Sequence, residues 1–84
     1  MPYSQSMTKR DTEAVLDVSG LLCPLPVLRA RKHLESMATG DVLRVIATDP
    51  MAAIDMPHFC DEQGHTLVFH DKQNDILIFR IRRR

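Results

Sequence analysis

The cysteine at position 23 is the side chain in this 84-residue sequence that is best suited to chemistry. It stands in the segment Gly-Leu-Leu-Cys-Pro-Leu-Pro, residues 20–26, between a glycine and two prolines. Proline lacks an N–H and has φ fixed near about −65°, so a helix tolerates it only in its first turn. This pattern predicts that Pro24 is the first helical residue and that Cys23 caps the helix. Gly20, Pro24 and Pro26 are therefore expected to position the thiol.

A helix N-terminus favours the thiolate form of a nearby cysteine, because the helix dipole places partial positive charge there. We therefore expect the pKa of the Cys23 thiol to be lowered and the thiol to act as the nucleophile. A capping side chain usually accepts a hydrogen bond from the second or third helical N–H. Pro26 would be the third helical residue and has no N–H, which leaves only the Leu25 N–H in that role. The sulfur is thus predicted to be directed by the helix without being fully held.

No catalytic partner for Cys23 can be identified in the sequence. His58, His65 and His70 are distant from it along the chain, so the pattern does not support a Cys–His catalytic pair. The four histidines also lack the spacing of metal ligands, and neither a metal nor a bound cofactor is expected. Cys60 stands on the apolar face of a predicted helix, which favours a core residue; a resolving thiol is the alternative.

Basic residues cluster on the predicted helix that follows the cysteine. Arg29, Arg31 and Lys32 form a patch near its thiol end, which is either a solvated face or a docking patch for acidic partner proteins. The arginines at 82–84 are interpreted as a solvent-exposed chain end that could weakly steer an acidic partner or an RNA. Eleven basic and eleven acidic side chains give zero formal net charge, which argues against a dedicated nucleic-acid binder.

The first half of the sequence predicts a strand, a helix and a second strand. Residues 13–18 alternate between apolar and polar side chains, as in a short strand. Residues 24–38 have apolar side chains at helical spacing, and Gly40 would be the left-handed cap of this amphipathic helix. Residues 42–48 are rich in β-branched and apolar side chains, which predicts a central strand buried on most of its surface.

The second half predicts another helix and a hairpin. Residues 51–63 form the helix, which follows an Asp-Pro pair and ends at a glycine, with a kink or a break at Pro57. Residues 65–71 and 76–82 are strands joined by a polar turn at 72–75. The strand residues expected to face the core are Leu67, Phe69, Leu77, Phe79 and Ile81.

This order predicts an α+β fold with the arrangement β-α-β-α-β-β. A right-handed crossover pairs the first two strands in parallel, which gives a two-layer α/β sandwich: a four-stranded mixed sheet with both helices on one face. Residues 1–12 are expected to be a flexible lead-in and residues 13–84 a single domain. No apolar run approaches the ~18 residues of a membrane-spanning helix, and no signal-peptide pattern is present, so a cytoplasmic protein is expected.

Several segments together resemble the TusA/SirA-like family of small sulfur carriers. The matching motifs are Gly20-Leu21-x-Cys23-Pro24-x-Pro26, Arg31-Lys32, Asp49-Pro50 and Asp55-x-Pro57-x-Phe59-Cys60. The resemblance implies the same two-layer sandwich and a role for Cys23 as the carrier of sulfane sulfur, held as a persulfide. It also implies a cysteine desulfurase or rhodanese-like protein as the donor and a DsrE-like or TusD-like protein as the acceptor. In relatives the sulfur ends in 2-thiouridine of tRNA or enters sulfur oxidation.

The sequence departs from the tRNA-thiolation type of this family at Leu25, where those members usually carry glutamate. This departure leaves the carrier role intact and does not name the pathway. Leu25, Arg29, Arg31 and Lys32 are the expected docking residues for partner proteins, and the carrier is expected to be a monomer that depends on partner enzymes. A redox-sensing or regulatory module that uses the same cysteine is the alternative function, and direct RNA binding is the least favoured.

Overall fold

The computed structural model describes residues 13–84, so the predicted flexible lead-in, residues 1–12, lies outside the described residues. In chain order the elements are β1 (Ala14–Asp17), α2 (Leu25–Glu35), β2 (Val42–Ala47), α3 (Ala52–Gln63), β3 (Thr66–Gln73) and β4 (Ile76–Arg82). Neither helix in this part of the chain is long and apolar enough to cross a membrane.

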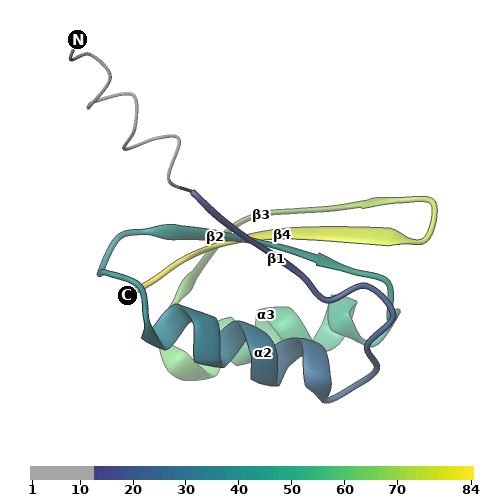
Figure 1. Cartoon of the computed structure of the whole chain (residues 1–84), viewed down its shortest axis with the longest axis horizontal. Coiled ribbons are helices and arrows are strands. Elements are labelled where there is room, and N and C mark those ends of the chain that lie inside the picture. Colours follow the sequence, from purple (N-terminus) through teal and green to yellow (C-terminus); the bar gives the residue numbers. More distant parts are fainter. Residues whose placement is uncertain (1–12) are drawn as a thin grey trace, which may run out of the picture.

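The four strands form one mixed sheet in the order β1-β2-β4-β3. β1 and β2 are parallel, as the crossover through α2 requires, and β4 pairs antiparallel with both β2 and β3. Both helices lie on the same side of the sheet (Figure 1). The predicted α+β two-layer sandwich is therefore confirmed.

The core lies between the sheet and the two helices. Its fully buried side chains come from the inner sides of the helices and of the two central strands, as the apolar spacing predicts. They include Ala30, Leu34, Leu43, Val45, Met56, Phe59, Phe79 and Ile81. Cys60 belongs to the same cluster, so its prediction as a core residue is confirmed.

The first helix is shorter than predicted, and Gly40 is not its cap. The helix ends at Glu35 because the N–H groups of Ser36 and Met37 each turn back to a carbonyl three residues earlier, at 3.0 Å. Gly40 does have a positive φ of 92°, but it lies in the following loop. Its N–H donates to the carbonyl of Arg83 at 2.9 Å, which holds this loop against the strand end.

A kink or a break is predicted at Pro57; α3 is continuous through this residue, so the break is wrong. Proline removes a single helical donor there, which leaves only the carbonyl of Ala53 without its usual partner, and Ala53 is exposed to water. The helix ends as predicted at Gly64, whose φ of 79° is left-handed. The adjoining N–H of His65 donates to the Cys60 carbonyl at 2.9 Å.

Phe69 does not face the core as predicted. An irregularity between Leu67 and Phe69 shifts the register of β3 against β4, so Leu67 packs on the core while Phe69 lies opposite Arg80 on the outer face. β2 is central in the sheet as predicted, but its outer side is less buried than its inner side, because Val42 and Ile46 are half-buried there and Arg44 is exposed. The hairpin turn is shorter than predicted, because Asn74 accepts a left-handed φ of 58°.

The two leucines of α2 that differ most in burial provide a test of this core. Leu34 is 1% exposed and Leu28 is 49% exposed. We predict that Leu34→Ala lowers the free energy of unfolding by about 2–5 kcal/mol, because it leaves a cavity under the sheet. Leu28→Ala, the same change on the same helix, should alter it by less than about 0.5 kcal/mol. Urea titration followed by circular dichroism measures both; equal losses would contradict the packing described here.

Candidate functional site

Cys23 lies one residue before the cap of α2, so the prediction that it caps the helix is wrong. The first helical hydrogen bond runs from the Leu28 N–H to the Pro24 carbonyl at 3.1 Å, which makes Pro24 the cap and places Pro26 inside the first turn. The Leu25 N–H donates to the Leu22 carbonyl at 2.8 Å and does not serve the sulfur. The thiol therefore sits in a tight turn before the helix.

The backbone of Cys23 is held by a carboxylate from the connection between β2 and α3. Its N–H donates to Oδ2 of Asp49 at 2.6 Å, and Oδ1 of the same carboxylate accepts the Met51 N–H at 3.2 Å. Asp49 follows β2, precedes α3 and is only 8% exposed. One carboxylate thus joins the loop before α2 to the turn that begins α3.

Gly20 provides a second attachment for the same loop. Its N–H donates to Oγ1 of Thr48 at 2.8 Å, and its φ of 83° lies in the left-handed region that favours glycine. The predicted positioning residues Gly20, Pro24 and Pro26 are therefore all in the loop or first turn that presents Cys23.

The thiol lines a shallow groove of about 270 Å3 between α2 and α3. Val27, Leu28 and Arg31 contribute from α2. The wall from α3 includes Asp55, His58, Phe59 and Glu62. Cys23 itself is exposed and is not in a disulfide. Such a groove offers one accessible sulfur with mixed apolar and charged surroundings, and it does not enclose a small substrate.

The electrostatic environment of Cys23 is the opposite of the one predicted. Its pKa is raised from the usual value, first because the Asp55 carboxylate in the same groove favours the protonated thiol as a hydrogen-bond donor, and also because of partial desolvation. The negative charges of Asp55 and Asp49 further disfavour the thiolate. These groups therefore favour the thiol over the thiolate, which is contrary to the predicted lowering of the pKa of Cys23.

The other titratable candidates divide between groove and core. His58, which the sequence could not place near Cys23, lines the same groove and lies 3.4 Å from the Glu62 carboxylate. Burial raises the pKa of the Cys60 thiol to about 11, which disfavours a resolving role. Within residues 13–84, no group of three or more His, Cys, Asp or Glu side chains is placed to hold a metal ion.

The predicted docking residues are all accessible. Leu25, Arg29 and Lys32 are exposed, while Arg31 lines the groove and lies 3.6 Å from Glu35. Large exposed apolar side chains that sequence reasoning did not single out flank the starts of both helices: Leu22, Leu28, Met51 and Ile54. Their exposure favours protein contact around the thiol. The sequence could not identify them, because apolar residues of a helix are exposed or buried according to the tertiary packing.

The effect of Asp55 on the thiol gives a testable pH dependence. Because the carboxylate favours the protonated thiol, Asp55→Asn should lower the pKa of Cys23 and increase its thiolate fraction near neutral pH. The pH profile of iodoacetamide alkylation, followed by mass spectrometry, should move to lower pH. Asp61→Asn, an exposed change on the same helix, should leave the profile in place. A shift of the Asp55→Asn profile to higher pH would contradict this account.

The sequence is similar to known sulfur carrier proteins over most of its length. The family model described as sulfurtransferase TusA matches residues 14–83. The sulfur carrier protein TusA of Pseudomonas putida strain GB-1 is 40% identical over 78 residues, covering 93% of this chain and 98% of that protein. The protein of the same name from Allochromatium vinosum is 42% identical over 73 residues, covering 87% and 96%.

Solved structures agree with the sequence comparisons. The crystal structure of the SirA-like protein from Desulfitobacterium hafniense matches with a TM-score of 0.71 and 26% identity, covering 82% of this chain and 95% of that one. Since the family model and the curated relatives each span most of the sequence, this chain belongs to the TusA sulfurtransferase family.

Proposed function

We propose that this protein is a sulfur carrier that holds sulfane sulfur as a persulfide on Cys23 and passes it between partner proteins. The observation that carries the proposal is the exposed thiol of Cys23, fixed through its backbone by Asp49. A carrier needs an accessible sulfur on a rigid loop, and it needs no deep pocket because its partners supply the rest of the active site. The relatives named as sulfur carriers support this role.

Loading is a transfer of one sulfur atom between two cysteines. The Cys23 thiolate attacks the outer sulfur of a persulfide on the donor protein, forming a new S–S bond. The S–S bond of the donor breaks, and the donor cysteine leaves as a thiolate with the electron pair. No net oxidation occurs, because one S–S bond replaces another. Unloading repeats the step, with the acceptor thiolate attacking the outer sulfur on Cys23.

The raised pKa of Cys23 gives the donor protein a role in this step. The thiol proton has to leave before attack, and Asp55 favours the protonated thiol in the free protein. A donor that brings a positive charge to the groove would offset the Asp55 carboxylate and release the thiolate only in the complex. Reactivity would then depend on docking, which protects the unloaded carrier from unrelated electrophiles.

The proposed donor is a cysteine desulfurase or a rhodanese-like protein, and the proposed acceptor is a DsrE-like or TusD-like protein in the cytoplasm. These partners follow from the family resemblance, and they fit the exposed apolar and basic residues beside the thiol, including Leu25 and Arg29. The final product would be 2-thiouridine in tRNA or a product of sulfur oxidation. Leu25, in place of glutamate between the prolines, leaves both routes open.

Intact-protein mass spectrometry tests the loading of Cys23. Incubation with a cysteine desulfurase and cysteine, or with a rhodanese and thiosulfate, should add the mass of one sulfur atom, and dithiothreitol should remove it. Cys23→Ser should take up none, whereas Cys60→Ala should load as the wild type does, because Cys60 is buried in the core.

Two outcomes of this experiment would overturn the proposal. Uptake by the Cys23→Ser variant would place the sulfur elsewhere. Failure of the wild type to load from either donor, together with ready formation of sulfenic acid under mild oxidation, would favour the redox-sensing module instead.

A further inference from the structure

Within residues 13–84, no second layer of structure covers the outer face of the sheet. The helices pack on the opposite side (Figure 1), so the outward side chains of all four strands meet solvent. Strand register aligns one outward residue from each strand in a continuous row across the sheet. The row consists of Val15, Arg44, Arg80 and Phe69.

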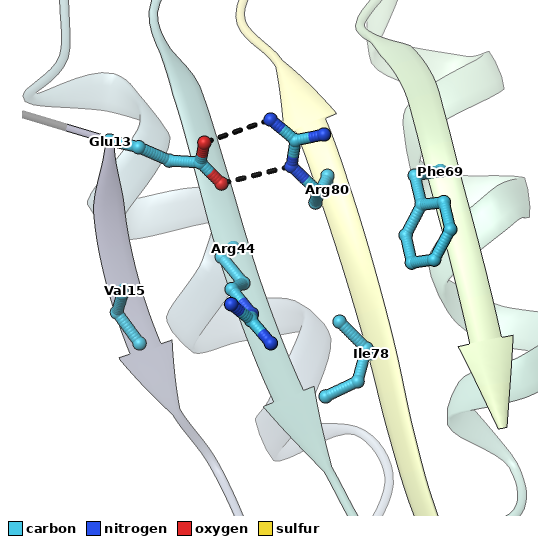
Figure 2. A pocket seen from close by; sticks show the side chains of 6 residues that line it. All are labelled: Glu13, Val15, Arg44, Phe69, Ile78 and Arg80. Atoms are coloured by element: carbon cyan, nitrogen blue, oxygen red, sulfur yellow. Dashed lines mark hydrogen bonds and ion pairs between the residues drawn. The ribbon is translucent and has the colours of Figure 1, made fainter. Parts of the chain in front are cut away.

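This row forms the centre of an open depression of about 490 Å3, which Glu13 and Ile78 complete (Figure 2). Val15 is 58% exposed and Phe69 is 45% exposed, although both are large apolar side chains. Strands of a soluble domain normally present polar residues on an uncovered face. Large apolar side chains exposed on such a face, here on either side of Arg44 and Arg80, favour contact with a partner.

The charges in the depression do not balance. The Glu13 carboxylate accepts hydrogen bonds from Nε and Nη2 of Arg80, at 3.0 and 2.9 Å, and is fully engaged by that guanidinium. Arg44 extends into the same space between Val15 and Ile78 (Figure 2) and forms no ion pair within residues 13–84. Two guanidinium groups thus share one carboxylate, which leaves one positive charge among apolar side chains.

The complement of this surface is a carboxylate flanked by apolar groups. A guanidinium presents parallel N–H donors that match the two oxygens of a carboxylate. Covering Arg44 with an apolar surface alone would remove its charge from water without a partner, which is strongly unfavourable. An acidic side chain between apolar neighbours would satisfy Arg44 and cover Val15, Ile78 and Phe69 at the same time.

We propose that the outer face of the sheet, centred on Arg44, is a docking site for a partner protein that presents an acidic side chain between apolar residues. The site lies on the side of the sheet opposite the helices, whereas the Cys23 groove lies between the helices. A partner bound here would hold the carrier and leave its thiol free for a second protein. This consequence rests on the proposed carrier function; the docking site itself does not.

Two other occupants fit the charge of this face less well. If a second copy stacked its depression directly on this one, the Arg44 and Arg80 guanidinium groups of the two copies would face each other. Residues 1–12 join the sheet beside the depression, at Glu13, but they contain two basic side chains and one acidic side chain. Neither occupant brings a net negative charge to Arg44.

The test uses two matched synthetic peptides and nuclear magnetic resonance of the 15N-labelled full chain. One peptide is acetyl-Leu-Glu-Leu-Glu-Leu-amide and the other replaces both glutamates with lysine. We expect the acidic peptide to shift the backbone amides of Val15, Arg44 and Ile78 in a saturable way, with a Kd below about 1 mM. The basic peptide should leave the chemical shifts of these amides unchanged, and added salt should weaken the binding of the acidic peptide.

Variants separate the depression from the rest of the charged surface. Arg44→Glu should weaken binding of the acidic peptide at least about tenfold. Arg44→Leu, which keeps apolar bulk and removes the charge, should also weaken this binding. Lys72→Glu makes a charge reversal at an exposed position of β3 that does not line the depression, and it should have little effect. Sulfur loading on Cys23 should be normal in Arg44→Glu, so failure of this proposal and failure of the carrier proposal are distinguishable.

Three results would overturn the docking proposal. The first is shifts confined to the helical layer, and the second is equal affinity of Arg44→Glu and the wild type for the acidic peptide. The third is no saturable shift up to about 1 mM peptide. A concentration-dependent dimer that Arg44→Glu disrupts would assign the face to a second copy instead. Stronger peptide binding after deletion of residues 1–12 would show that those residues compete with the peptide for this face.

Discussion

The carboxylate of Asp49 joins the two segments that define the site. It accepts the Cys23 N–H from the loop before α2 and the Met51 N–H from the turn before α3. Because Asp49 is largely buried, these charge-assisted hydrogen bonds form where water competes weakly. Both helices begin beside this carboxylate, and the thiol projects from the point where they meet. The sheet and the helix packing give Asp49 its fixed place, and Asp49 in turn places the sulfur.

Holding the sulfur through its backbone leaves the side chain unconstrained. The Cys23 thiol is exposed in a shallow groove, and its chemistry is set by Asp55 and by whatever docks. An enzyme would need a base and an enclosed pocket at this position, whereas a carrier has to meet several different active sites. Rigid backbone, exposed sulfur and a protonated resting state together suit a protein whose reactivity is completed by its partners.

The sequence predicts the layers better than the details of the site. Apolar spacing predicts both helices and β4 because each has one continuous buried side, as Leu34 and Phe79 illustrate. Apolar spacing misplaces Phe69 because an irregularity in β3 reverses the side-chain alternation, and no residue type in this segment indicates such an irregularity. Cys23 is identified correctly as the exposed thiol, but its pKa is misjudged. The helix start is local in sequence, whereas Asp49 and Asp55 reach the thiol only through the tertiary fold.

The central claim is that one buried carboxylate fixes the loop that carries the thiol, and amide hydrogen exchange of Cys23 measures this directly. The account predicts that the Cys23 amide is protected in the wild type, because it donates to Asp49. In Asp49→Ala the protection of this amide should be lost while the amides of β2 stay protected, which shows that the sheet is intact. A Cys23 amide that exchanges in the wild type as fast as an unstructured peptide, or equally slowly in both proteins, would contradict the account.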